Sequence, residues 1–218
     1  MRINSQGLIF RQRGKAFGLS LGLSFIFLGV LFSLGAGAVE PGSATEAVKR
    51  TIEEVLAVLS DENLKKPERA EERRTLLEEV IGKRFDYAEM GKRTLGRHWK
   101  KLTEKQQVEF VALFQRFLSN SYSRNVDGYA GEQVKYLKER RKGDFAEVQT
   151  KVISKKLRIP LDYRLLKKSN EWRVYDVVID GVSLVKNFRG QFSRIIKSSS
   201  YQGLIQKLRA KTGQDLTQ

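Results

Sequence analysis

The chain has 218 residues, of which 41 are Lys or Arg and 25 are Asp or Glu, so its formal net charge is +16. It contains no cysteine and a single histidine. This composition excludes disulfides, thiol nucleophiles and the common structural zinc sites, so packing alone must stabilise the fold.

Residues 1–38 have the pattern of an export signal. An uncharged, apolar stretch covers residues 17–34, and the small residues Ala36, Gly37 and Ala38 follow it. We expect cleavage after Ala38; the alternative is an uncleaved anchor, because the apolar stretch is long enough to span a bilayer. The part before the apolar stretch carries four basic residues, which are Arg2, Arg11, Arg13 and Lys15.

Removal of this segment leaves 37 Lys and Arg residues against 25 Asp and Glu residues, a net charge of +12. The roughly 180 remaining residues are enough for one domain with its own core. A basic surface attracts phosphate, on nucleic acid or on anionic lipid headgroups. Export favours lipid, and the alternative is that the charge only keeps the chain solvated.

The first half of the exported chain has helical periodicity. Residues 39–44 read as a linker before a domain over 45–218, and Thr45 can cap a first helix that ends near Asp61. That helix has one apolar stripe, formed by Val48, Ile52, Val55 and Leu59. A second helix is predicted from Pro67, and a third helical segment over 85–99, interrupted by Gly96.

A long helix is predicted over residues 103–124. Thr103 and Gln106 fit a capping box at its start. Its apolar positions cover more than a narrow stripe, so it needs apolar partners on two sides. These positions are Val108, Phe110, Val111, Leu113, Phe114, Phe117, Leu118 and Tyr122.

The period changes to alternation from Gln133. Strands are predicted over 133–137, 145–154, 158–167 and 171–180, and their short polar connections favour an antiparallel meander with one polar and one apolar face. After Gly181 a helical stripe returns, and a last short helix follows from Tyr201. The predicted fold class is α+β, with an antiparallel sheet of about four strands covered by N-terminal and C-terminal helices.

Catalytic and metal-binding motifs are not indicated. The one serine-hydrolase pattern, residues 18–22, lies inside the export signal, where a strand-turn-helix context is impossible. His98 has no sequence partner that suggests a nucleophile or a metal site. Asp176 and Asp180 have the even spacing of one strand face, but Val178 shares it, so no acid pair is evident. Basic and aromatic residues do not alternate as a nucleic-acid stacking surface requires.

Three runs resemble the MlaC family, also called toluene-tolerance auxiliary proteins. They are "LGRHWKKLTEKQQVEFVALFQRFLSNSYSR", "IPLDYRLLKKSNEWRVYDVVIDGVSLVKNFRGQFSRII" and "YQGLIQKLRAK". The resemblance covers roughly residues 80–211 and is most specific over "WRVYDVVIDGVSLVKNFR". One departure is Phe188, where the family commonly has tyrosine.

The resemblance implies a noncatalytic periplasmic shuttle without cofactor or metal. Such a shuttle carries phospholipid between the outer and inner membranes and maintains outer-membrane lipid asymmetry. The implied partners are an inner-membrane ABC transporter complex with its MCE-domain subunit, an outer-membrane lipid-extracting lipoprotein complex and, transiently, the membrane surface, but no nucleic acid. The alternative function is a lipid-modifying hydrolase that uses the same apolar pocket.

A carrier needs an apolar pocket between the sheet and the helices, and two sets of residues are candidates for binding. Exposed cations could contact the headgroup or the membrane, although ordinary surface charge is the better explanation for each taken alone; they are Arg97, Lys100, Lys101 and Arg189. Apolar residues could line the pocket or simply fill a core; they are Phe110, Phe114, Phe117, Leu118, Tyr122, Tyr163, Leu165, Val174, Val177, Ile179, Val182, Val185, Phe188 and Phe192.

Overall fold

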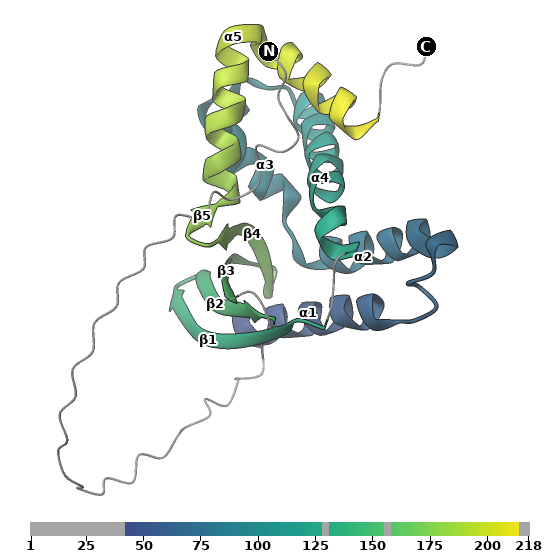
Figure 1. Cartoon of the computed structure of the whole chain (residues 1–218). Coiled ribbons are helices and arrows are strands. Elements are labelled where there is room, and N and C mark those ends of the chain that lie inside the picture. Colours follow the sequence, from purple (N-terminus) through teal and green to yellow (C-terminus); the bar gives the residue numbers. More distant parts are fainter. Residues whose placement is uncertain (1–41, 128–130, 155–157, 214–218) are drawn as a thin grey trace, which may run out of the picture. The chain divides into compact units, whose positions relative to one another are not determined.

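The computed structural model describes residues 42–127, 131–154 and 158–213, with backbone alone for 122–127. The predicted export signal and its cleavage site lie outside these residues. The described part is a mixture of helices and one antiparallel sheet (Figure 1), which confirms the α+β prediction.

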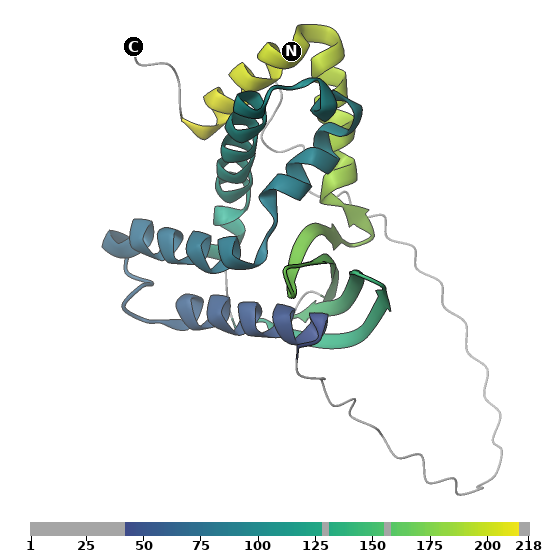
Figure 2. The same ribbon diagram turned by 180° about the vertical axis from the view of Figure 1, so that it is seen from behind.

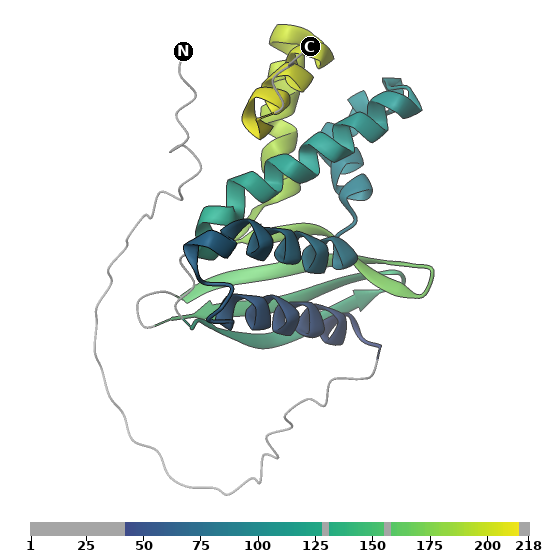
Figure 3. The ribbon, with the colours of Figure 1, turned by 90° about the vertical axis from the view of Figure 1, so that its right-hand side faces the viewer.

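Two helices at the N-terminal end run side by side over one face of the sheet (Figure 3). They are α1 (Ala44–Ser60) and α2 (Ala70–Arg84), joined through a 3₁₀ turn, η1 (Pro67–Arg69). Ser43, not the predicted Thr45, caps α1 by accepting a hydrogen bond from the Glu46 N–H (3.1 Å). Thr45 instead donates its N–H and its hydroxyl to the carboxylate of Glu139 on the neighbouring strand (2.8 and 2.7 Å).

The next helices are α3 (Tyr87–Leu95), the 3₁₀ segment η2 (Gly96–Lys101) and α4 (Glu104–Asp127). Gly96 ends α3 with a positive φ of 55°, a conformation that favours glycine. The predicted capping box of α4 is confirmed, because Thr103 N–H donates to Gln106 Oε1 (3.0 Å) and Gln106 N–H to Thr103 Oγ1 (3.3 Å).

The sheet has five strands in the order β1-β2-β3-β4-β5, all antiparallel. The four predicted strands are present, and β1 is longer than expected. The fifth has only two residues, too few for an alternating pattern. The strands are β1 (Gln133–Lys142), β2 (Phe145–Ile153), β3 (Arg158–Lys168), β4 (Glu171–Ile179) and β5 (Val182–Ser183).

The chain then continues into α5 (Leu184–Thr212), a helix with a kink at Ser200, where φ is 69°. The kink separates the two helices that the sequence predicts. Ser183 caps α5 by accepting from the Lys186 N–H (3.0 Å). Figure 2 shows α5 rising from the sheet beside α3 and α4.

Buried side chains form two clusters. The helical cluster joins α3, α4 and α5, whereas the sheet cluster joins α1 to the apolar face of β2, β3 and β4. Phe85 and Leu184 are half-buried and pack against both. The opposite face of the sheet is polar, with Arg164 paired to Glu147 and Asp176 (3.3 and 3.2 Å), so the prediction of one polar and one apolar face is confirmed.

Candidate functional site

An apolar cavity of about 160 Å³ lies between α1, α2 and the apolar face of the sheet. The stripe predicted on α1 provides one wall, the end of α2 another, and β3 and β4 the third. The lining residues are Val48, Thr51, Ile52, Val55, Ile81, Arg84, Phe85, Tyr163 and Val174. Because six of these nine side chains are pure hydrocarbon, the cavity suits an apolar ligand.

Arg84 is the one charged side chain in this lining. Its Nε donates to the hydroxyl of Thr51 on α1 (3.1 Å), and its Nη1 donates to the carbonyl of Trp172 on β4 (2.7 Å). The side chain is half-buried, and burial lowers its pKa from the usual 12.5, helped by the nearby charges of Arg173 and Arg50. Arginine still stays protonated at any physiological pH.

Tyr163 contributes the aromatic part of the cavity wall from β3. Burial raises the pKa of its hydroxyl well above 10, with a smaller contribution from Tyr136. The phenol therefore stays neutral and behaves as part of an apolar wall.

A second hollow, of about 410 Å³, lies at the junction of α2 and α3 and the turn between β3 and β4. It shares Phe85 with the apolar cavity but carries two ion pairs on its rim, Lys168 with Asp86 and Arg173 with Glu171 (2.8 Å). The chain at Phe85 lies along β4, where the Asp86 N–H donates to the carbonyl of Val174 (2.8 Å).

The structure divides the predicted lining residues between the two clusters. Tyr163 and Val174 line the cavity, and Leu165, Val177 and Ile179 pack in the sheet cluster around it. Val182 is 44% exposed, and the side chain of Tyr122 lies outside the described part. The remaining seven lie in the helical cluster: Phe110, Phe114, Phe117, Leu118, Val185, Phe188 and Phe192.

The helical cluster is packed by aromatic rings in mutual contact. The ring of Phe114 lies 5.6 Å from that of Phe110, 5.9 Å from Phe188 and 6.0 Å from Phe192, centre to centre. These separations are those of favourable stacked and edge-to-face pairs. Neither of the two hollows described above is lined by any of these four rings.

Asp176 and Asp180 do not form a pair. Asp176 is buried and accepts hydrogen bonds from Arg164, the Ser183 hydroxyl (2.6 Å) and the Val185 N–H (3.1 Å). Asp180 is exposed in the turn after β4, with φ of 49°. The even spacing does not place both residues on one strand face, because β4 ends at Ile179 and Asp180 lies outside it. Asp176 therefore holds the start of α5 against the sheet.

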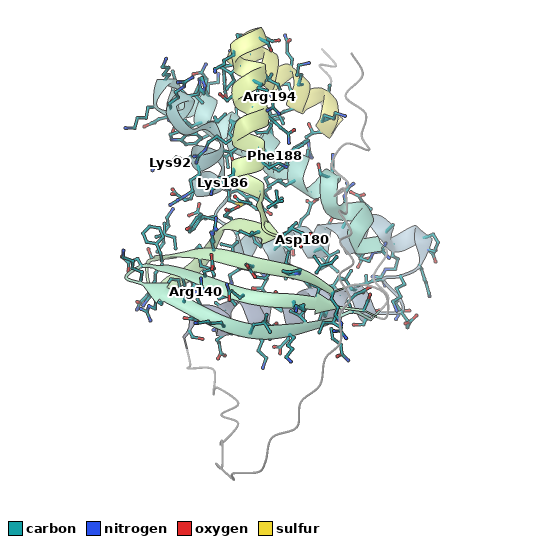
Figure 4. The ribbon with its side chains drawn as sticks, turned by 60° about the vertical axis from the view of Figure 1, so that its left-hand side comes forward. Lys92, Arg140, Asp180, Lys186, Phe188 and Arg194 are labelled. Carbon is teal, nitrogen blue, oxygen red and sulfur yellow. The ribbon has the colours of Figure 1, made fainter. Side chains whose placement is uncertain are left out.

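The four predicted cations lie along η2 and the start of α5. Arg97, Lys100, Lys101 and Arg189 are all exposed, and within the described residues none has a carboxylate within ion-pair distance. Arg189 donates from Nε to the carbonyl of Arg93 (2.7 Å). Figure 4 shows further cations, Lys186 and Arg194, on the outside of α5.

His98 lies among these cations. Burial lowers its pKa from 6.5, and the charges of Arg97, Lys101 and Lys197 lower it further. Its Nε2 is buried without a hydrogen-bond partner among the described atoms. Burial and the three nearby cations all disfavour the charged form of His98.

The described residues contain no group of three or more His, Asp or Glu side chains placed to hold a metal ion. Over the same residues, none of the helices combines the length and the apolar character that crossing a bilayer requires.

A family model described as "MlaC protein" matches residues 49–210. The chain belongs to the MlaC family. The matched region contains α2, α3, α4, the whole sheet and most of α1 and α5, so it includes every residue of the cavity lining except Val48.

Two proteins illustrate this membership. The intermembrane phospholipid transport system binding protein MlaC of Haemophilus influenzae is 25% identical over 138 residues, which are 61% of this chain and 64% of that protein. A phospholipid-binding protein of Ralstonia solanacearum, solved in complex with a phospholipid, matches with a TM-score of 0.70 and 28% identity, covering 79% of this chain and 98% of that one.

The part of the cavity lining that the sequence does not predict is the wall made by α1 and the end of α2. Val48, Ile52 and Val55 were recognised as an apolar stripe but not as lining. The signal was present, because a helix preceding the meander must cover its apolar face. No comparable signal marks Arg84, which lies in a run of mixed charges.

Proposed function

We propose that this chain is a periplasmic phospholipid carrier that holds acyl chains between α1, α2 and the sheet. Membership of the MlaC family is the observation that carries the proposal, and the similar Ralstonia solanacearum protein was solved with a phospholipid. The apolar cavity supports this location, because it lies between the α1–α2 layer and the apolar face of the sheet.

Enclosure of the chains is an energetic requirement. Each methylene transferred from water gains about 0.8 kcal/mol, so leaving two ordinary acyl chains in water would cost on the order of 20 kcal/mol or more. A carrier must therefore surround them almost completely.

The cavity must also enlarge to do this. Its 160 Å³ corresponds to only about five groups of water size, at about 30 Å³ each. We infer that the α1–α2 pair is the wall that moves, because Leu77 is the one buried side chain of α2, and Leu59 is the one buried side chain in the second half of α1. The N-terminal turns of α1 are fixed, since Ala44, Ala47 and Val48 are buried in the sheet cluster.

The proposal includes the route that the family implies. Residues 1–38 direct export and are removed, and residues 45–218 form the lipid-binding domain. The carrier exchanges lipid with an inner-membrane ABC transporter complex with its MCE-domain subunit and with an outer-membrane lipoprotein complex, and it maintains lipid asymmetry without catalysis. The exposed cations Arg97, Lys100, Lys101 and Arg189 make transient contact with anionic membrane surface.

The test is the lipid content of the exported protein. Mass spectrometry of an organic extract from purified protein should show intact phospholipid at near-stoichiometric amount. Protein that co-purifies with no lipid and takes none up from vesicles contradicts the carrier function. Release of lysolipid or free fatty acid during incubation would favour a hydrolase, which no observation on this chain supports.

A further inference from the structure

Arg84 differs from Arg74, another arginine on α2, in its surroundings. Arg74 on the same helix is exposed and pairs with Glu71 (2.6 Å). Arg84 is half-buried in the cavity lining, and its two hydrogen bonds go to neutral acceptors, the hydroxyl of Thr51 and the carbonyl of Trp172. Within the described part of the chain, no carboxylate lies within ion-pair distance of its guanidinium, and its Nη2 has no hydrogen-bond partner.

The charges around Arg84 compensate it only in part. Glu54 and Glu171 are near enough to favour its charged form, but Glu171 is already paired with Arg173 (2.8 Å). The next cation, Arg50, lies close to Glu46 (3.8 Å). A half-buried guanidinium is less well hydrated than an exposed one, so an anion that reaches its free Nη2 stabilises the charge.

We propose that Arg84 binds the phosphate of the lipid whose acyl chains occupy the adjoining apolar cavity. The inference rests on the carrier function proposed above. Thr51 and Trp172 fix the guanidinium through Nε and Nη1, and Nη2 is left to donate to a phosphate oxygen. Arginine suits this role because its planar donors match phosphate oxygens and it remains charged.

The position of Arg84 also determines the orientation of the bound lipid. Arg84 is at the C-terminal end of α2 and is partly exposed, whereas Val48, Ile52 and Tyr163 line the same cavity with apolar surface. A phosphate at Arg84 therefore places the acyl chains in the hydrocarbon lining and leaves the variable part of the headgroup toward solvent. Such a site selects for the phosphodiester that all glycerophospholipids share rather than for one headgroup.

The experiment compares two ligands with the same acyl chains, dioleoylphosphatidylglycerol and 1,2-dioleoylglycerol, which lacks the phosphate. Both are delivered from detergent micelles to the full exported protein, and bound lipid is counted by native mass spectrometry. Arg84→Gln should weaken phosphatidylglycerol binding by about 10- to 100-fold, the range for a charged hydrogen bond, and leave diacylglycerol binding unchanged. Arg84→Lys keeps the charge but loses the planar arrangement of donors, so its phosphatidylglycerol binding should weaken less than that of Arg84→Gln.

Arg74→Gln is the matched control, because it removes an exposed arginine from the same helix. It should leave the binding of both ligands unchanged. Equal losses for both ligands would overturn the proposal and make Arg84 a structural link between α2, α1 and β4. Unchanged phosphatidylglycerol binding in Arg84→Gln would also overturn it. Wild-type protein that binds neither ligand contradicts the carrier function itself, which separates that failure from a failure of the phosphate site.

Discussion

The same substitution at two sites distinguishes a cavity wall from a filled core. Val55 lines the cavity from α1, and Val185 is 4% exposed in the helical cluster at the start of α5. A tryptophan at position 55 has space to enter, so Val55→Trp should change the free energy of unfolding by less than about 1 kcal/mol. A tryptophan at position 185 meets packed rings, and overpacking should cost about 1–3 kcal/mol.

Lipid binding should weaken in Val55→Trp and stay unchanged in Val185→Trp, the reverse of the order expected for stability. An indole that fills the 160 Å³ cavity displaces about five methylene-sized groups of ligand, each worth about 0.8 kcal/mol, and so weakens binding by at most about 4 kcal/mol. Val185→Trp should keep its lipid per folded molecule, while its melting temperature falls by about 2–12 °C.

Thermal unfolding monitored by circular dichroism, together with phosphorus analysis of purified protein, measures both effects. A Val55→Trp variant that is destabilised and retains its lipid, together with a stable Val185→Trp variant that loses it, would refute the assignment of the cavity wall. That result would place the acyl chains among Phe110, Phe114, Phe188 and Phe192, where the sequence alone suggested them.

Four further changes test the framework and the docking surface. Phe114→Ala, which removes a ring fully buried among three others, should cost about 3–5 kcal/mol in urea unfolding; a loss under 1 kcal/mol would mean that the cluster is loosely packed. Asp176→Asn should cost about 2–4 kcal/mol because it removes the charge that Arg164, Ser183 and the start of α5 share, whereas Asp180→Asn, in an exposed turn, should stay within about 0.5 kcal/mol. His98 has a lowered pKa when folded, so the unfolded chain binds its proton more readily and stability should fall as pH drops below about 6.5; His98→Gln should remove that part of the slope of urea midpoints, and an unchanged slope would contradict the assignment. The double change Arg97→Gln with Lys101→Gln should reduce sedimentation with phosphatidylglycerol vesicles at low salt and not with neutral vesicles, and equal binding by wild type and variant would exclude this surface from docking.

The fold could be predicted from the sequence because periodicity, caps and turns agree with one another. Thr103 with Gln106 marked the start of α4, and the alternation after Gln133 marked the meander. β5 could not be predicted because two residues carry no period, and Ser43 capped α1 because a tertiary contact with Glu139 occupies Thr45.

The site was only partly predictable, for a physical reason. A helix stripe or strand face has the same apolar composition whether it fills a core or lines a cavity, so Phe114 and Val55 look alike in sequence. Which one faces free space depends on the distance between layers, set by long-range packing of α1 and α2 on the sheet. Arg84 became apparent only when its partners from α1 and β4 were in place.

β1 forms one edge of the sheet, and its residues bear on how this chain meets its own copies. The strand has a bulge at Leu137. It also includes five basic residues, which are Lys135, Lys138, Arg140, Arg141 and Lys142. Like charges and an irregular backbone both oppose the addition of a second strand at an edge. At the opposite edge, β5 ends after two residues and turns into α5. Under the proposed carrier function, these two edges keep the sheet from pairing with another copy of the chain while the α1–α2 layer is displaced from it.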